Sequence, residues 1–177
     1  MVKVASLFLA SMAFLAAHSL AADADADFKN EVLTLHREYR ARYGANPLTW
    51  SDDLYPATLE WANACSPQHS QPKSQYGEVM YSGDESYVTF AKGMEAWMDE
   101  ASRYDYINPG FSGATGEFTQ VVWKATTQVA CAMVSCPARR KFRDALKNIV
   151  CHYYPPGNIY NQFRDNVGYP VQEAAQP

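Results

Sequence analysis

Three stretches of the chain space their apolar residues as a helix does when it packs by one face. The first, from about Phe28 to Tyr43, ends at Gly44, a natural stop. The second follows Ser51, a typical capping residue, and runs toward Cys65. The third runs from about Tyr87 to Arg103. We therefore predict three helices with these apolar faces: Val32, Leu35, Tyr39 and Tyr43; Leu54, Leu59 and Trp61; Val88, Phe90, Met94 and Trp97.

Two later stretches have the composition of strands. Val129 to Val134 and Lys147 to Tyr154 are rich in β-branched and aromatic residues. After Pro155, residues of the Pro, Gly and Asn types occur throughout, which predicts mainly loop. Helices first and strands later are typical of an α+β domain. Because neither repeats nor a linker interrupt the pattern, we predict one domain.

The N-terminus has the pattern of an export signal. Lys3 precedes an apolar run from Val4 to Ala17, and a small-x-small cleavage pattern ends at Ala21. This run of about 14 residues is shorter than the roughly 20 that span a bilayer. We expect residues 1–21 to be a signal peptide and the product to be extracellular and secreted. The alternative is an uncleaved, buried helix. The acidic stretch 22–27 is expected to be a mobile leader, and 171–177 a flexible tail.

Charge and cysteine content narrow the class further. The net charge is −4, and the only basic run, Ala138 to Arg143, is more simply a solvated loop, so nucleic acid is not an expected partner. Four cysteines follow the signal peptide, and in an exported chain they predict two disulfides with three possible pairings: Cys65, Cys131, Cys136 and Cys151. Their spacing does not offer the close pairs of a zinc–thiolate site.

Two motifs carry a family resemblance. They are the stretch Gly116 to Lys124, which reads Gly-Glu-Phe-Thr-Gln-Val-Val-Trp-Lys, and Cys151 to Asn158, which reads Cys-His-Tyr-Tyr-Pro-Pro-Gly-Asn. Together they resemble the signature motifs of the CAP superfamily, also called SCP/TAPS proteins, and most of all its fungal pathogenesis-related-like secreted members. The resemblance implies a CAP domain over residues 28–170, folded as an α-β-α sandwich with a small antiparallel sheet between helical layers. It also implies the disulfides Cys65–Cys136 and Cys131–Cys151.

The resemblance further implies a central cavity. In the family, two His and two Glu side chains converge there, and several members hold a divalent metal. Three of the four positions match His69, Glu78 and Glu100, whereas the fourth, usually His, is Glu117. Three carboxylates and one imidazole favour harder cations over Zn²⁺, and without a cation one carboxyl should have a raised pKa. Two alternatives stay open: a cavity without cofactor, in which Glu117 is protonated, and a weak divalent-cation site.

Catalysis lacks a matching motif. Ser70 adjoins His69, but neighbouring residues rarely meet side chain to side chain in a productive geometry. His36 and His152 are interpreted as structural. We therefore predict that the protein is not an enzyme; the alternative would be a weak divalent-cation hydrolase.

Lipid binding is the function that the resemblance favours. The family includes members that bind sterols or fatty acids, and its sterol-binding loop resembles Tyr104 to Phe111. Tyr104, Tyr106 and Phe111 are the candidate lipid contacts. Of these we expect Phe111 to meet ligand and Tyr104 to pack on the core. The loop and the tetrad cavity are expected to be separate sites. The alternative is a secreted module that recognises a protein of a host or neighbouring organism, as virulence and defence-evasion factors do. We expect the protein to be a monomer.

Overall fold

The computed structural model of the 177-residue chain describes residues 25–70, 75–138 and 144–171. The predicted signal peptide, residues 22–24 of the leader, most of the basic run and residues 172–177 lie outside the described residues. A helix over residues 25–41 comes first. The elements that follow are β1 (Thr49–Trp50), α2 (Tyr55–Ala64), β2 (Gly77–Asp84), α3 (Phe90–Asp99), a 3₁₀ turn (Glu100–Arg103), α4 (Gly116–Val121), β3 (Gln128–Cys136), β4 (Leu146–Tyr154) and α5 (Phe163–Asn166).

The strands form one sheet in the order β1-β3-β4-β2. β4 is antiparallel to both β3 and β2, whereas the two-residue β1 pairs with β3 in parallel, so the sheet is mixed at one edge. The two predicted strands are confirmed as β3 and β4, each slightly longer than expected. β1 and β2 were not predicted. β2 lies at the other edge of the sheet, where it positions part of the site described below.

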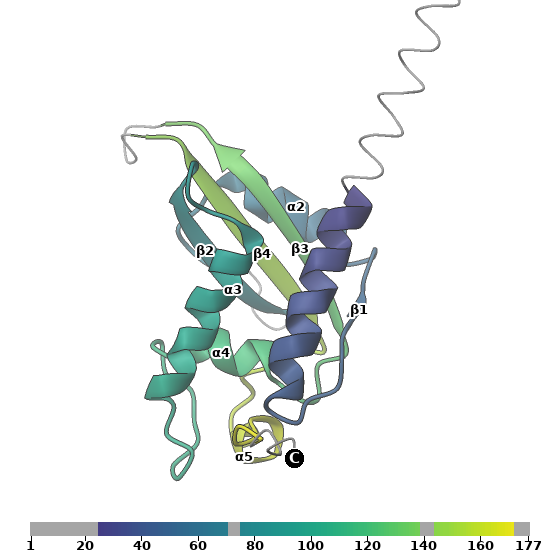
Figure 1. Cartoon of the computed structure of the whole chain (residues 1–177), viewed down its shortest axis with the longest axis vertical. Helices are drawn as coiled ribbons and strands as arrows, with labels where there is room; N and C mark the ends of the chain where they lie inside the picture. Colours follow the sequence, from purple (N-terminus) through teal and green to yellow (C-terminus); the bar gives the residue numbers. More distant parts are fainter. Residues whose placement is uncertain (1–24, 71–74, 139–143, 172–177) are drawn as a thin grey trace, which may run out of the picture.

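Helices cover both faces of this sheet (Figure 1). One face packs on α2 through a small cluster that includes Ala62, Ala132 and Val150. The other face packs on helix 25–41, α3 and α4 through the main core. Side chains alternate between the two clusters along β3 and β4, as the period of a strand requires. The predicted α-β-α sandwich is therefore confirmed.

The first helix begins earlier than the sequence indicated. Residues 25–27 are helical, so the expectation of a mobile leader is wrong for this part of it. Lys29 lies 3.1 Å from Asp25, one helical turn away. Acidic residues in a first turn also interact favourably with the helix dipole. The helix ends at residue 41, and Gly44 adopts a positive φ of 66° in the following turn.

The other two predicted helices are shorter than expected. Ser51 does not occupy the cap position of α2; its hydroxyl oxygen instead accepts the N–H of Leu54 at 3.3 Å, one turn earlier. α3 starts at Phe90 because the side chain of Thr89 caps it, accepting the N–H of Lys92. No helix among the described residues is long and apolar enough to cross a membrane.

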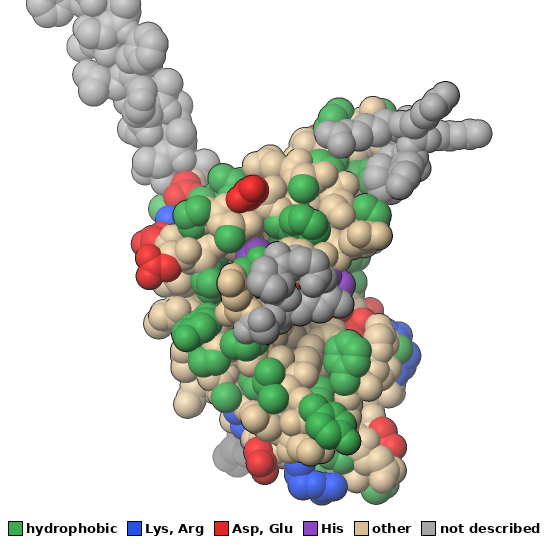
Figure 2. All heavy atoms as spheres, turned by 180° about the vertical axis from the view of Figure 1, so that it is seen from behind, with side chains coloured by type: hydrophobic (Ala, Val, Ile, Leu, Met, Phe, Trp, Pro, Cys, Tyr) green, Lys and Arg blue, Asp and Glu red, His purple; other side chains and the backbone are tan. Residues whose placement is uncertain are grey.

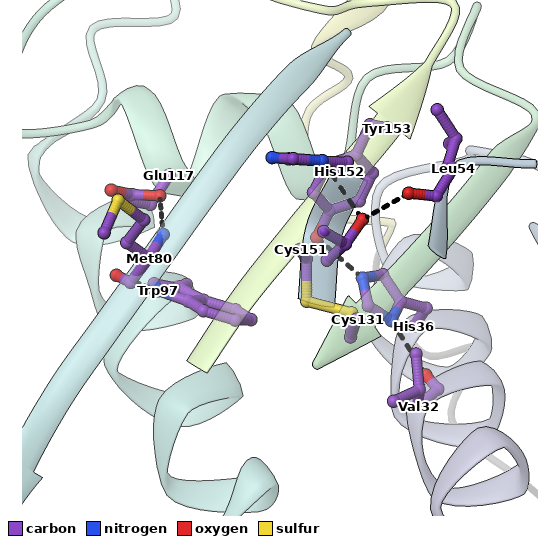
Figure 3. The surroundings of a disulfide bond; sticks show 11 residues. Val32, His36, Leu54, Met80, Trp97, Glu117, Cys131, Cys151, His152 and Tyr153 are labelled. Carbon is purple, nitrogen blue, oxygen red and sulfur yellow. Dashed lines mark hydrogen bonds between the residues drawn. A yellow bond between two sulfur atoms is a disulfide. The ribbon is translucent and has the colours of Figure 1, made fainter. Parts of the chain in front are cut away.

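Both predicted disulfides are confirmed. Cys65, just after α2, is joined to Cys136 at the end of β3, 71 residues away. Cys131 and Cys151 face each other directly across β3 and β4 and are also joined. The first bond ties α2 to the sheet, and the second lies in the main core (Figure 3).

Candidate ligand-binding site

A cavity of about 500 Å³ opens beside the first residues of β2. Five segments surround it: the chain after α2, the start of β2, the loop before α4, α4 itself and the loop after β4. Its polar lining includes His69, Ser70, Tyr76, Glu78, Glu117, Gln120 and Asn158. Its apolar and glycine lining includes Gly77, Phe111, Gly113, Gly116, Pro156, Gly157 and Ile159.

Glu78 is the centre of the polar side of this cavity. One carboxylate oxygen lies 2.6 Å from Nδ1 of His69 and accepts the backbone N–H of Ser70 at 3.0 Å. The other accepts the Ser70 hydroxyl at 2.5 Å and lies 2.9 Å from Nε2 of His152. Burial alone would raise the pKa of Glu78, but the hydrogen bonds from His152, His69 and Ser70 together lower it to about 2. Glu78 is therefore a firmly held anion at neutral pH.

Glu117, the second residue of α4, closes the cavity from the side of the sheet edge. Its Oε2 accepts the N–H of Met80 on β2 at 3.2 Å, while the carbonyl of Met80 accepts the indole N–H of Trp97 at 2.9 Å (Figure 3). Burial raises the pKa of Glu117 to about 8, and the nearby Glu100 and Glu78 act in the same direction, against the opposing effects of His69 and the Met80 N–H. The raised carboxyl pKa expected from the sequence is thus found at Glu117.

Glu100, unlike the other members of the predicted tetrad, binds backbone groups at the start of α4. Its Oε2 accepts the backbone N–H groups of Glu117 and Phe118 at 3.0 and 3.1 Å, which satisfies the start of α4. It does not line the cavity. Within the part of the chain that the structure describes, no group of three or more His, Cys, Asp or Glu side chains is placed to hold a metal ion. The weak cation site stays a prediction that this arrangement does not support.

The three candidate lipid contacts lie in different surroundings. Tyr104 is buried and packs edge-on against Phe118 and Tyr106, as expected for a core residue. Tyr106 stacks on Tyr169, with ring centroids 4.7 Å apart, and does not line the cavity. Phe111 is 66% exposed and lines the cavity together with Glu117. The expectation that the loop and the tetrad cavity are separate sites is therefore wrong at Phe111, because the chain before α4 folds back over the helix start.

Sequence reasoning missed two residues that organise the site. His152 contacts Glu78 because the two are direct partners across β4 and β2, and its ring also stacks on Tyr76 with centroids 3.8 Å apart. Gln120 is buried beside Gly77, and its Oε1 accepts the N–H of Gly157 at 2.8 Å. A Cβ at Gly77 would lie 1.8 Å from that oxygen, so any larger residue there would displace the Gln120 amide from Gly157. Only the register of β2 against β4, which places Glu78 opposite His152, could have indicated the role of His152.

Comparisons with known proteins identify the family of this chain. The sequence model of the CAP, or cysteine-rich secretory protein, family matches residues 33–153. This chain belongs to the CAP family. Protein PRY2 of Saccharomyces cerevisiae is 38% identical over 144 residues, which are 80% of this chain but 41% of that protein. The CAP chain described here therefore spans about two fifths of the length of its yeast relative.

Two further proteins match this chain over more than three quarters of their own length. Pathogenesis-related protein 1A of Nicotiana tabacum is 35% identical over 136 residues, 73% of this chain and 76% of the tobacco protein. Among solved structures, the Hookworm Platelet Inhibitor matches with a TM-score of 0.62 over 85% of this chain and 78% of its own, at 18% identity. That structural likeness concerns the fold.

The hydrogen bonds of this CAP cavity decide which polar groups can meet a ligand. Ser70 donates its hydroxyl to Glu78 and not to an imidazole, so no serine–histidine pair forms here among the described contacts. At pH 7 Glu117 carries a proton and can donate a hydrogen bond into the cavity. Its second oxygen has no hydrogen-bond partner among residues 25–70, 75–138 and 144–171. The cavity thus offers one anion, one protonated acid and an apolar rim.

Proposed function

We propose that this CAP protein is secreted and binds a small neutral lipid that carries a hydroxyl group, such as a sterol, in the cavity beside β2. The observation that carries the proposal is the division of the cavity lining into a polar floor and an apolar rim. Glu78, whose side chain is 6% exposed, and Glu117 supply the floor, whereas the exposed Phe111, Ile159 and His69 stand at the rim, two of them apolar. A volume of about 500 Å³ lies within the range of cavities that hold small molecules.

The charges of the floor favour a hydroxyl over a carboxylate. Glu78 is ionised at neutral pH because its hydrogen bonds lower its pKa to about 2. The carboxylate of a fatty acid would meet this anion at close range and be repelled. A hydroxyl carries no charge, and it can accept a hydrogen bond from the protonated Glu117. Of the two lipid classes expected from the sequence, sterols therefore fit this cavity better than fatty acids.

The proposal of an extracellular location has independent support. Two disulfides are stable chiefly in oxidising compartments. The family name describes secretory proteins, and a relative from Candida albicans carries the name Secreted protein RBT4. We accordingly retain the signal peptide as part of the proposal.

A direct binding assay tests the function. Purified protein is titrated with a fluorescent sterol and, separately, with a fluorescent fatty acid of similar apolar size at pH 7. The proposal expects saturable binding of the sterol that unlabelled sterol displaces, and weaker binding of the fatty acid. A protein that binds neither ligand would refute the proposal. A protein that binds the fatty acid more tightly would refute the role assigned to Glu78.

A second candidate function is recognition of another protein, for example of a host organism. It is favoured by large exposed apolar side chains on the loops before α4 and after β4, such as Ile107 and Tyr160. Absence of lipid binding in the assay, together with an intact fold, would make this reading the better one.

A further inference from the structure

We propose that one end of the molecule docks on the surface of an uncharged lipid bilayer and holds the mouth of the cavity against it. This docking surface, here called the apolar end, consists of six exposed side chains: Ile107, Phe111, Ile159, Tyr160, Tyr169 and Val171. They lie on the loop before α4, on the loop after β4 and just after α5. The inference rests on the proposed function for its purpose, since a membrane is where a sterol would be collected or delivered.

The distribution of exposed apolar side chains singles out this end. Among the described residues, eight large hydrophobic side chains are exposed, and the apolar end holds six of them. Their exposed fractions, in the order given above, are 76, 66, 38, 85, 65 and 56%. Single exposed apolar residues are ordinary, but a concentration on adjacent segments marks an interaction surface.

The segments that carry these side chains are held together. Tyr169 stacks on Tyr106, and its hydroxyl donates to the carbonyl of Tyr106 at 3.3 Å. Arg164 on α5 donates to the carbonyl of Ile107 at 3.3 Å. The loop before α4 lies with α5 at the lower end of the molecule in Figure 1. Hydrophobic side chains are spread over the whole face shown in Figure 2, its lower half included, and Lys or Arg side chains also lie at its lower end. The apolar end is therefore one connected platform.

Three properties of the platform fit a bilayer. Ile107 and Phe111 are suited to insertion between acyl chains, while the tyrosines suit the headgroup level, where a ring meets both apolar and polar surroundings. Phe111 and Ile159 also line the cavity, so the docking surface and the ligand entrance are continuous.

Charge decides which bilayer the platform fits. Residues 104–115 and 155–171 carry one Arg against two Asp, whereas Arg42, Arg103 and Lys124 contact these segments from neighbouring elements. Glu100 lies beside Arg103, so basic and acidic groups around the surface nearly balance, and the whole chain has a net charge of −4. Anionic lipids attract basic surfaces, and this surface has no marked excess of basic groups. A zwitterionic bilayer, in which burial of apolar side chains supplies the binding energy, is therefore the partner that fits.

Vesicle flotation with the full secreted protein tests the inference. Vesicles of phosphatidylcholine alone are compared with vesicles that also contain phosphatidylserine. We expect the wild type to float with the first kind, and no tighter with the second. Ile107→Ser and Tyr160→Ser, which leave the cavity lining unchanged, should each lower the apparent affinity for vesicles about tenfold, because a large apolar side chain can no longer be buried. Tyr87→Ser, which alters an aromatic side chain 59% exposed between β2 and α3, is the matched control and should float as the wild type does.

The outcomes separate this inference from the proposed function. Wild type that stays unbound to phosphatidylcholine overturns the inference, as does a requirement for phosphatidylserine or an equal loss in Tyr87→Ser. Self-association that Ile107→Ser abolishes, without vesicle binding, would assign the surface to a second copy of the chain instead. Sterol binding is measured in detergent for the same variants and should persist in Ile107→Ser and Tyr160→Ser. Vesicle binding without any sterol binding would leave the docking surface in place and refute the proposed function.

Discussion

Nε2 of His152 lies 2.9 Å from a carboxylate oxygen of Glu78, its direct partner across β4 and β2. The contact joins residues 74 positions apart and fixes the floor of the cavity to the centre of the sheet. Thr58 of α2 lies 3.0 Å from Nδ1 of the same ring, so both imidazole nitrogens are engaged. His152 is thus a link between α2, the sheet and the candidate site.

Removal of this link should change both stability and its acid dependence. His152→Ala leaves buried polar partners unsatisfied, so we expect the free energy of unfolding to fall by about 1–3 kcal/mol at pH 7. The pKa of Glu78 is about 2 in the folded state, below its ordinary value of 4.5, so its stabilising contribution is present above pH 4.5 and lost as the pH falls toward 2. The variant should lose less stability than the wild type within this window. Urea unfolding at pH 7, 4.5 and 3 measures both effects.

A second buried histidine provides the control. Burial lowers the pKa of His36 to about 4 from 6.5, so the folded state resists its protonation and loses stability as the pH falls from 6.5 to 4. In His36→Ala, the free energy of unfolding should no longer fall between pH 6.5 and 4. The fall between pH 4.5 and 2 that Glu78 causes should remain. If His152→Ala and His36→Ala both remove the loss of stability in the same pH range, the assignment to Glu78 is wrong.

The second prediction concerns the rim of the cavity. Phe111→Ala should weaken sterol binding about ten- to a hundredfold, because a ring covered by ligand contributes roughly 1.5–3 kcal/mol. The fold should survive, since Phe111 is 66% exposed in the free protein. Fluorescence titration, with circular dichroism as the check on folding, measures this.

Two other variants sharpen the same test. Tyr87→Ala, an exposed aromatic residue outside the cavity, should bind sterol as the wild type does. Glu117→Ala should also weaken binding, because Glu117 and Phe111 line one cavity. Equal sterol affinity in the wild type and Phe111→Ala would remove the loop from the site.

Local pattern explains which elements the sequence could predict. β3 and β4 carry long runs of β-branched and aromatic residues, and the helices that form the main core have clear apolar faces. β2 was missed because Gly77, Glu78, Ser82, Gly83 and Asp84 give it the composition of a loop. It is an edge strand that depends on β4 for its order. α4 has only six residues, too few for a helical period to show.

The candidate site was predictable only as a set of residue types. His69, Glu78, Glu117 and Phe111 followed from the resemblance, and all four line the cavity. The separate roles of these residues could not be predicted from the sequence, because they depend on strand register and on the fold of the loop before α4. Glu100 caps α4, and His152 on β4 contacts Glu78 on the neighbouring strand β2. Neither contact leaves a local pattern in the sequence.

The third prediction uses the titration of Glu117. Its pKa of about 8 in the folded state exceeds the ordinary 4.5, so the folded state holds the extra proton between these values. Stability should therefore fall as the pH rises from 4.5 through 8, by an amount on the order of a few kcal/mol. Glu117→Gln, which keeps an oxygen for the Met80 N–H, should remove this fall and be more stable than the wild type at pH 9. Urea midpoints at pH 5, 7 and 9 measure it.

The control for this experiment is a carboxylate in the open. Glu60 is exposed on α2, and Glu60→Gln should follow the pH profile of the wild type. Parallel profiles for the wild type and Glu117→Gln between pH 5 and 9 would contradict the burial argument.

The fourth prediction concerns metal. We expect weak Zn²⁺ binding by the wild type, since carboxylates outnumber imidazoles in the cavity and Glu78 is already engaged by His69 and His152. Glu117→His should raise Zn²⁺ affinity by adding the ligand type that this ion prefers. Titration calorimetry measures the change, and a further His69→Ala substitution should abolish the gain. Tight, stoichiometric binding by the wild type that His69→Ala abolishes would sink the prediction.

The two hydrogen bonds of the Met80 backbone affect whether the edge of the sheet can pair with another chain. β2 ends the sheet, and an open strand edge is a template on which another chain can add a strand. Here Glu117 occupies the N–H of Met80 and Trp97 occupies its carbonyl, so the middle of this edge is closed to such pairing. A residue at position 117 that cannot accept the N–H would leave this backbone group without its partner. One side chain therefore both lines the cavity and helps to close the edge of the sheet.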